Sequence, residues 1–217
     1  MDAFLASQPL VVDYPSAWAR SARVALVALV GPPVLLGLTS AAGHPLRAGV
    51  EIIIWTGALV GFAGAGWLTG RQTRQGTRGT MVMAASSLVT GVCVTPAFRG
   101  LQGLTGHEPI VVVVAATLGA FAAGFGMGGA IAACAAGIAT SRLARTGAAC
   151  ALAGSAGGAL ALLPFTWSLL GLRFPGDTYL WMALTLMAFL GCIIVPFYWM
   201  GAIIARGIGD GVAVDKG

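Results

Sequence analysis

Residues 110–140 read IVVVVAATLGAFAAGFGMGGAIAACAAGIAT, a run that contains no Asp, Glu, Lys, Arg or His. Similar apolar runs make up most of the remaining chain, each near or above the ~20 residues that a helix needs to cross a bilayer. Their interiors carry no charged residue, and only Glu51 stands at the mouth of one of them. The sequence therefore predicts an all-α, polytopic transmembrane bundle of six helices, at residues 24–42, 50–70, 79–98, 110–140, 146–172 and 178–205.

The composition indicates the same fold class. Of the 217 residues, 58% are hydrophobic and 9% are charged, and the mean hydropathy of +0.89 is too high for a soluble globular protein. The segments outside the spans are too short to form a soluble domain. We predict a single integral membrane domain over 1–217, with an N-terminal segment at 1–23, helices across 24–205 and a tail at 206–217.

The N-terminal segment is rich in apolar and aromatic residues such as Phe4 and Trp18. This pattern predicts that residues 1–18 lie along the inner membrane surface, although Pro9 and Pro15 argue against one continuous helix there. The segment has no basic stretch at its start, so we expect no cleavable signal peptide.

The basic residues lie outside the spans and divide unequally between the two sides of the predicted bundle. One side has nine of them: Arg20, Arg23, Arg71, Arg74, Arg78, Arg142, Arg145, Arg206 and Lys216. The other side has Arg47, Arg99 and Arg173. Positive residues in short loops favour the cytoplasmic side. We therefore predict a multi-pass protein of the cytoplasmic (inner) membrane with both termini in the cytoplasm, anchored by Arg71, Arg74, Arg142 and Arg145.

The formal net charge of +5 does not indicate a nucleic-acid-binding protein. The basic residues cluster at helix ends, and no basic patch is interleaved with aromatic residues. The expected partners are membrane lipids, and other membrane protein subunits or further copies of this chain.

Two loops share the pattern T-x-R-x-x-R-x-G, at 69–76 and 140–147. Each follows a Gly/Ala-rich span that is itself preceded by a Gly-His element and a proline. Residues 43–103 and 106–176 are therefore predicted to be two copies of one unit, so that spans 2–3 and 4–5 form a parallel repeat of helical hairpins. Transporter folds often arise from such repeats, although proteins that only pack against others can be duplicated as well.

Glycines recur at a spacing of four residues within the spans. The pairs are Gly57 and Gly61, Gly124 and Gly128, and Gly154 and Gly158. Hydrophobicity does not drive helices together in lipid, so such small-xxx-small faces allow close backbone approach and van der Waals packing. We expect them to serve helix packing within this chain. A docking face for a partner helix, or the lining of a pore, is the alternative.

The fourth span is unusually long. A helix over 110–140 would have about 31 residues and a length of ~46 Å at ~1.5 Å per residue, against a ~30 Å hydrocarbon core. It must tilt, project beyond the membrane, or break near 124–129. A break would expose backbone that is tolerated only against protein or a water-filled cavity, which makes this segment a candidate functional site.

The sequence offers few groups for chemistry. His44 and His107 are the candidate ligands of a cofactor, if the fold brings the outer loops together, and Glu51 and Glu108 lie on the same side. A lone loop histidine beside a proline is more often a solvated residue. We therefore predict no catalytic residue, no metal and no cofactor, and we expect bound lipid.

Two further motifs have structural explanations. Cysteines fall within the spans without a CxxC pattern, as small packing residues do; they are Cys93, Cys134, Cys150 and Cys192. Residues 207–210 match the GxGD element of membrane aspartyl proteases, but those enzymes need a second aspartate at the same depth. None of the spans contains an aspartate.

Two hypotheses about function follow from these patterns. In the first, the chain is a non-catalytic integral membrane subunit that docks into and stabilises a larger membrane protein complex. In the second, it is a small uncoupled permease or channel for a neutral or weakly polar solute. The absence of charge within the spans argues against ion-coupled transport, and the glycine faces favour the first hypothesis.

The predicted orientation is tested by cysteine labelling in a chain whose native cysteines have been replaced by serine. Gln72→Cys should react with a membrane-impermeant maleimide from the cytoplasmic side only, and Gln102→Cys from the outside only, because basic loops stay in the cytoplasm. Equal labelling of both variants from the outside would refute the orientation.

Overall fold

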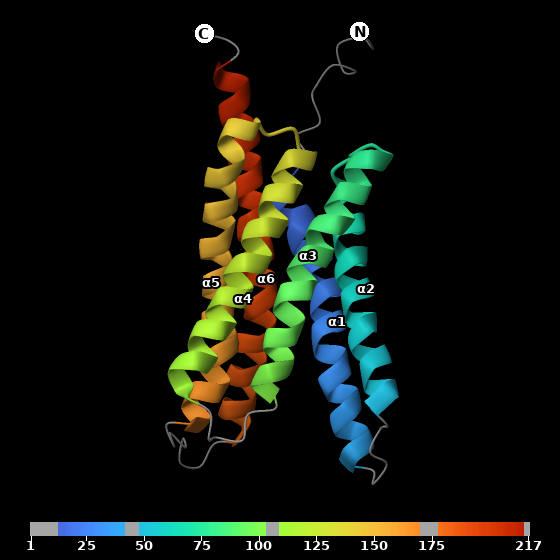
Figure 1. Ribbon diagram of the computed structural model, residues 1–217, viewed down its shortest axis with the longest axis vertical. Coiled ribbons are helices and arrows are strands. Elements are labelled where there is room, and N and C mark those ends of the chain that lie inside the picture. The colour runs from blue at the N-terminus through green and yellow to red at the C-terminus, as the bar shows by residue number, and fades with distance from the viewer. Residues whose placement is uncertain (1–12, 42–47, 103–108, 170–177, 215–217) are drawn as a thin grey trace.

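The computed structural model describes residues 13–41, 48–102, 109–169 and 178–214 (Figure 1). These residues form six α-helices and no strand. The helices are α1 (Tyr14–Ala41), α2 (Ala48–Gln72), α3 (Thr77–Gln102), α4 (Ile110–Ala135), α5 (Thr140–Leu169) and α6 (Thr178–Val214). Within the described part of the chain, four segments are long and apolar enough to cross a membrane: Thr77–Ala97, Ile110–Ala135, Thr140–Leu163 and Leu190–Ile208. The chain is thus a helical membrane bundle, as predicted.

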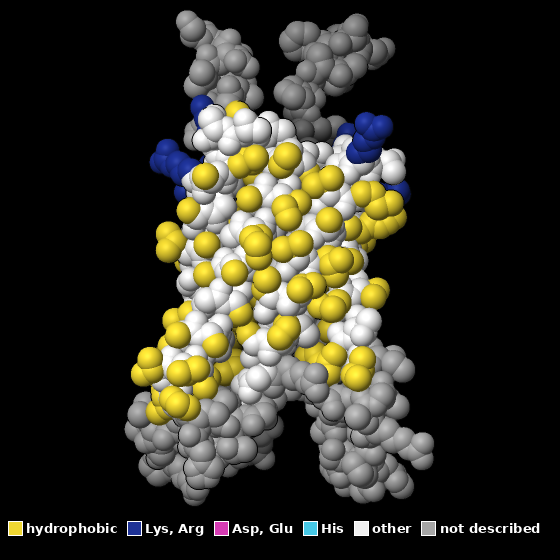
Figure 2. Space-filling model, viewed as in Figure 1, with side chains coloured by type: hydrophobic (Ala, Val, Ile, Leu, Met, Phe, Trp, Pro, Cys, Tyr) yellow, Lys and Arg dark blue, Asp and Glu magenta, His cyan; other side chains and the backbone are white. Residues whose placement is uncertain are grey.

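The helices form a closed ring. Each helix packs against the helices that precede and follow it in the sequence, and α6 packs against α1, which completes the circle. The start of α1, the end of α6 and the turns that join α2 to α3 and α4 to α5 all lie at one end of the bundle (Figure 1). We call this end the basic end, because the arginines whose side chains the structure describes gather there (Figure 2).

Helix α1 begins ten residues or so before the predicted position 24, at Tyr14. Asp13 caps it: the backbone N–H of Ser16 donates to Asp13 Oδ1 at 3.2 Å, which is the usual N-cap arrangement. Hydrogen bonding to the Ser16 side chain, and then to the Ser16 backbone N–H, lowers the pKa of the Asp13 carboxyl. Pro15 is tolerated because the first turn of a helix needs no N–H. The predicted surface segment at 1–18 is therefore helix from residue 14 onward, and residues 1–12 lie outside the described residues.

Helix α4 is shorter than predicted and is not broken. It runs without interruption through the glycines at 124–129 and ends at Ala135. A turn follows, in which Gly137 has a left-handed φ of +82°. The next helix, α5, already begins at Thr140. The long apolar run thus consists of one helix, its turn and the start of the next, and the prediction of a loop at 140–147 is wrong, because these residues are helical.

The chain leaves α2 and α4 through the same kind of turn. Arg74 and Gly137 occupy its left-handed position, with φ of 55° and 82°. The residue after each of them donates its N–H back to a carbonyl of the preceding helix, as in a Schellman motif. These closing bonds are Gln75 N to Gly70 O at 2.9 Å and Ile138 N to Ala133 O at 3.0 Å.

The T-x-R-x-x-R-x-G segments do not occupy equivalent places. Residues 69–76 span the end of α2 and its turn, whereas residues 140–147 lie wholly within α5. The alignment that we predicted from this motif is therefore wrong. The two turns instead align Arg74 with Gly137. The hairpin repeat itself stays a prediction. If the two hairpins are repeats, their residues align with Arg74 opposite Gly137.

The turn register also aligns the packing inside the two hairpins. Gly66 of α2 lies against Ser87 of α3, and the aligned Gly129 lies against Cys150. The second aligned pair of contacts is Phe62 with Gly91 and Phe125 with Gly154. Each hairpin is thus closed by a phenylalanine that packs on a glycine and by a glycine that packs on a small side chain.

Helix α6 has the same Phe-x-x-x-Gly arrangement. Phe197 precedes Gly201, as Phe62 precedes Gly66 and Phe125 precedes Gly129. A Cβ built on Gly201 would lie 2.9 Å from the Trp18 ring of α1. Every second helix of the ring therefore presents a phenylalanine and a glycine to its neighbours.

We expect Gly128→Leu to lower the free energy of unfolding by about 1–3 kcal/mol or more, since overpacking strains a closely packed contact. Gly128 lies against Ser86 and Thr90 of α3, with no room for a side chain. Gly119→Leu in the same helix is the control, because Gly119 is exposed and a Cβ there meets nothing within 4 Å. Thermal unfolding in detergent measures both variants; equal stabilities would contradict the packing.

Candidate functional site

Helix α3 carries five of the ten buried serine and threonine side chains among the described residues. They are Thr80, Ser86, Ser87, Thr90 and Thr95. Hydroxyl groups in an apolar bundle need hydrogen-bond partners, because lipid offers none. Hydroxyl groups with partners show where α3 packs closely on a neighbouring helix. Hydroxyl groups without partners show where a gap could admit another molecule.

Helices α3 and α4 are in close contact, and two hydrogen bonds join them. Ser86 Oγ donates to Gly128 O at 2.8 Å, and Thr90 Oγ1 donates to Gly124 O at 3.1 Å. Both glycine carbonyls are reachable because the absence of a side chain lets the two helices approach closely. We conclude that this contact holds the bundle together and is not itself a ligand site.

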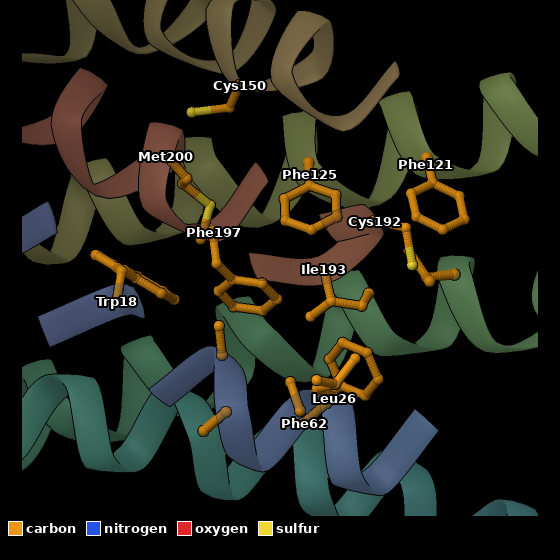
Figure 3. Packing of buried hydrophobic residues seen from close by; sticks show 14 of the residues in the cluster. Trp18, Leu26, Phe62, Phe121, Phe125, Cys150, Cys192, Ile193, Phe197 and Met200 are labelled. Atoms are coloured by element: carbon orange, nitrogen blue, oxygen red, sulfur yellow. The ribbon is translucent and has the colours of Figure 1, made fainter. Parts of the chain in front are cut away.

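Aromatic side chains fill the centre of the ring (Figure 3). The ring centroid of Phe197 lies 5.2 Å from that of Phe125, 6.4 Å from that of Phe62 and 5.6 Å from that of Trp18. All of these side chains are fully buried. We call these four residues the aromatic plug. It closes the middle of the bundle at this level, so the bundle in this state is packed and is not an open pore.

A groove of about 570 Å³ lies between α2 and α3, on the half of the bundle away from the basic end. Its lining is formed by Ile52, Trp55, Thr56, Leu59, Val92, Thr95, Pro96 and Gly100. Ile52 is 61% exposed and Val92 51% exposed, so the groove opens on the lipid-facing surface of the bundle. Its volume is within the range of small-molecule sites in proteins, roughly 300–1,000 Å³.

Two polar atoms of the groove lining are buried without a partner. Trp55 Nε1 and Thr95 Oγ1 have no hydrogen bond to any residue that the structure describes. Native proteins rarely leave such groups unpaired, and each case calls for an explanation. Trp18 Nε1, Ser21 Oγ and Ser87 Oγ are similarly unpaired, but they do not line the groove.

Most of the predicted packing glycines lie at helix contacts within this chain. Gly61 lies against Ala28, Gly124 against Cys93, Gly128 against Thr90, Gly154 against Phe121 and Gly158 against Leu118. Gly57 differs, because it is exposed and a Cβ built there meets nothing within 4 Å. The predicted role of Gly57 in helix packing is therefore not seen among the residues that the structure describes.

The predicted anchors all lie at the basic end (Figure 2). Arg71 is in the last turn of α2, with its guanidinium 5.8 Å from the centre of the Trp67 ring. Arg74 is in the turn, whereas Arg142 and Arg145 belong to the first turns of α5. The turn after α2 is also tied to α1, where Gln75 Nε2 donates to the Tyr14 hydroxyl at 3.0 Å.

The candidate ligands His44 and His107 lie outside the described residues, as does Glu108. Glu51 belongs to α2, but its side chain is not described. Among the residues that are described, no three His, Cys, Asp or Glu side chains come together as a metal site. Cys150 and Cys192 are buried packing residues.

Comparison with protein-family models, with curated proteins and with solved structures finds no match for this chain. Its function is therefore argued from its own residues.

The aromatic plug should contribute strongly to stability. We expect Phe197→Ala to lower the free energy of unfolding by about 3–5 kcal/mol, the usual cost of a large cavity in a packed core. Tyr198→Ala is the matched control, since Tyr198 is the next residue of α6 and faces outward. Chemical or thermal unfolding in detergent measures both, and a similar loss in the two variants would show that the centre of the ring is not tightly packed.

Proposed function

We propose that this protein is a non-catalytic integral membrane subunit that docks into a larger membrane protein complex. The observation that carries this proposal is a face of α2 that small residues leave open. Gly57 and Gly64 lie two turns apart on this face, and a Cβ built on either meets nothing within 4 Å. Val60, which lies between them, is 67% exposed. We call Gly57, Val60 and Gly64 the open face of α2.

A glycine within a helix destabilises that helix relative to alanine. Close packing of a neighbouring helix against the glycine can compensate for this loss. In this chain Gly66 and Gly128 are used in that way, since neighbouring helices lie against both. The open face has no such neighbour among the residues that the structure describes, and it suits a helix of another subunit or of a second copy, which would approach closely through van der Waals packing. This is the geometry that docking requires.

The packing of the ring favours this function over the uncoupled permease. A permeating solute would have to displace Phe62, Phe125 and Phe197, which contact one another in the centre. Ion coupling would in addition require charge within the membrane, which the predicted spans lack. A packed core with an unfilled outer face supports docking.

The docked protein is proposed to lie in the inner membrane with its basic end in the cytoplasm. The arginines at this end of the described bundle include Arg20, Arg71, Arg74, Arg142 and Arg145 (Figure 2). Arg20 Nε also donates to Gln72 Oε1 at 3.3 Å, which holds two helices together at that end. Positive residues near span ends favour the cytoplasmic side.

Purification from the native membrane in a mild detergent tests the proposal. We expect a partner protein in fixed stoichiometry, which Gly64→Leu removes because a bulky side chain blocks the close approach of a helix. Gly119→Leu, on an exposed part of α4, should leave the assembly intact, and both variants should keep the thermal stability of the free chain. A chain that purifies alone and lets a neutral solute into liposomes would instead establish the permease.

A further inference from the structure

When the α2–α3 hairpin is aligned with the α4–α5 hairpin through Arg74 and Gly137, the packing between the two helices differs at one pair of aligned positions. In α4 and α5, Gly158 packs directly on Leu118, with a Cβ built on the glycine 3.3 Å from the leucine side chain. The aligned residues of α2 and α3 are Trp55 and Thr95, and there the groove opens. The same position is thus closed and apolar in one hairpin, and open with polar atoms in the other.

Local sequence explains why a groove forms at this place in the first hairpin and not at the aligned place in the second. Near the basic end, α2 and α3 approach closely, since Gly66 lies against Ser87 and Gly70 against Thr80. Farther along, Gly157 and Gly158 allow α5 to approach its neighbours, whereas α3 has Val94 and Thr95 at the corresponding places. The bulkier residues hold the two helices apart and leave a space between them.

The groove is lined to bind a polar group, although most of its surface is apolar. Trp55 is 7% exposed and Thr95 is 5% exposed, yet the indole N–H and the hydroxyl have no partner among the described residues. Pro96 lies within α3 and has no N–H to donate to the Val92 carbonyl, which a helix would otherwise use. The groove thus offers one N–H donor, one hydroxyl and a carbonyl acceptor.

We propose that this groove is a binding site for a long-chain alcohol that enters from the bilayer. The hydroxyl group of the alcohol accepts the Trp55 N–H and donates to the Val92 carbonyl or to the Thr95 hydroxyl oxygen. Its hydrocarbon chain leaves between Ile52 and Val92 into the lipid. This site is on a different side of α2 from Gly57 and Gly64, so it is independent of the proposed docking.

The chemistry of the lining selects this ligand class. None of the lining residues that the structure describes is charged, so none of them compensates the charge of a phospholipid headgroup, whose desolvation is costly. A pure hydrocarbon would leave Trp55 and Thr95 unpaired, which a hydroxyl group would not. A neutral molecule with one group that both donates and accepts satisfies the site.

Photocrosslinking of the full chain in phosphatidylcholine nanodiscs tests the site. The probe is octadecanol with a diazirine next to its hydroxyl end, and the crosslinked residues are identified by peptide mass spectrometry. We expect saturable crosslinks to Trp55, Val92 and Thr95 that excess octadecanol displaces and excess octadecane does not. Crosslinks spread over the lipid-facing residues of all the helices, or equal displacement by octadecane, would overturn the proposal.

Variants separate the polar contact from the shape of the groove. Thr95→Val keeps the volume and should raise the probe concentration for half-maximal crosslinking roughly three- to tenfold, as expected for one lost hydrogen bond. Gly100→Leu should abolish the crosslinks, since a side chain there would extend into the groove without a clash at its Cβ. Ser155→Ala, a hydroxyl loss in α5, is the control. Thermal unfolding confirms that each variant is folded, and unchanged crosslinking in folded Thr95→Val would refute the polar contact.

Discussion

The close approach of helix backbones at glycines is the contact on which the rest of this bundle depends. Hydrophobicity gives helices in lipid no reason to associate, so packing and a few hydrogen bonds must hold them together. Gly124 and Gly128 provide both, because they admit α3 and present carbonyls that Thr90 and Ser86 reach. With larger residues at these two positions, Ser86 Oγ would lose the Gly128 carbonyl, and Thr90 Oγ1 would keep only the Ser86 carbonyl of its own helix.

The same contact accounts for the ring. Phe62, Phe125 and Phe197 each stand one turn before a glycine that packs on a neighbouring helix. The close approach at the glycine brings the phenylalanine into the centre, where Phe197 contacts the other two. The repeated Phe-x-x-x-Gly arrangement therefore has two results. The glycines let neighbouring helices approach closely, and the phenylalanines fill the centre of the ring at this level.

The charge-free spans were enough to predict the helices, because a bilayer leaves the backbone few alternatives. Helix ends were predicted less well. Asp13 caps α1 before its apolar part begins, and Arg142 and Arg145 lie within α5, since charged residues at a membrane surface do not end a helix. The groove could not be predicted, because Trp55 and Thr95 are far apart in sequence and neither belongs to a periodic pattern. Only the packing of α2 on α3 brings them together.

The comparison of the two hairpins supports the proposal that the groove is a binding site. Leu118 and Gly158 show that this position can be filled with apolar groups that need no partner. Trp55 and Thr95 instead place buried polar atoms there, at a cost in free energy that the fold does not require. Sequences tend to break the rules of stable packing at functional positions. The place where the two hairpins differ in this way is therefore the place where we propose the binding site.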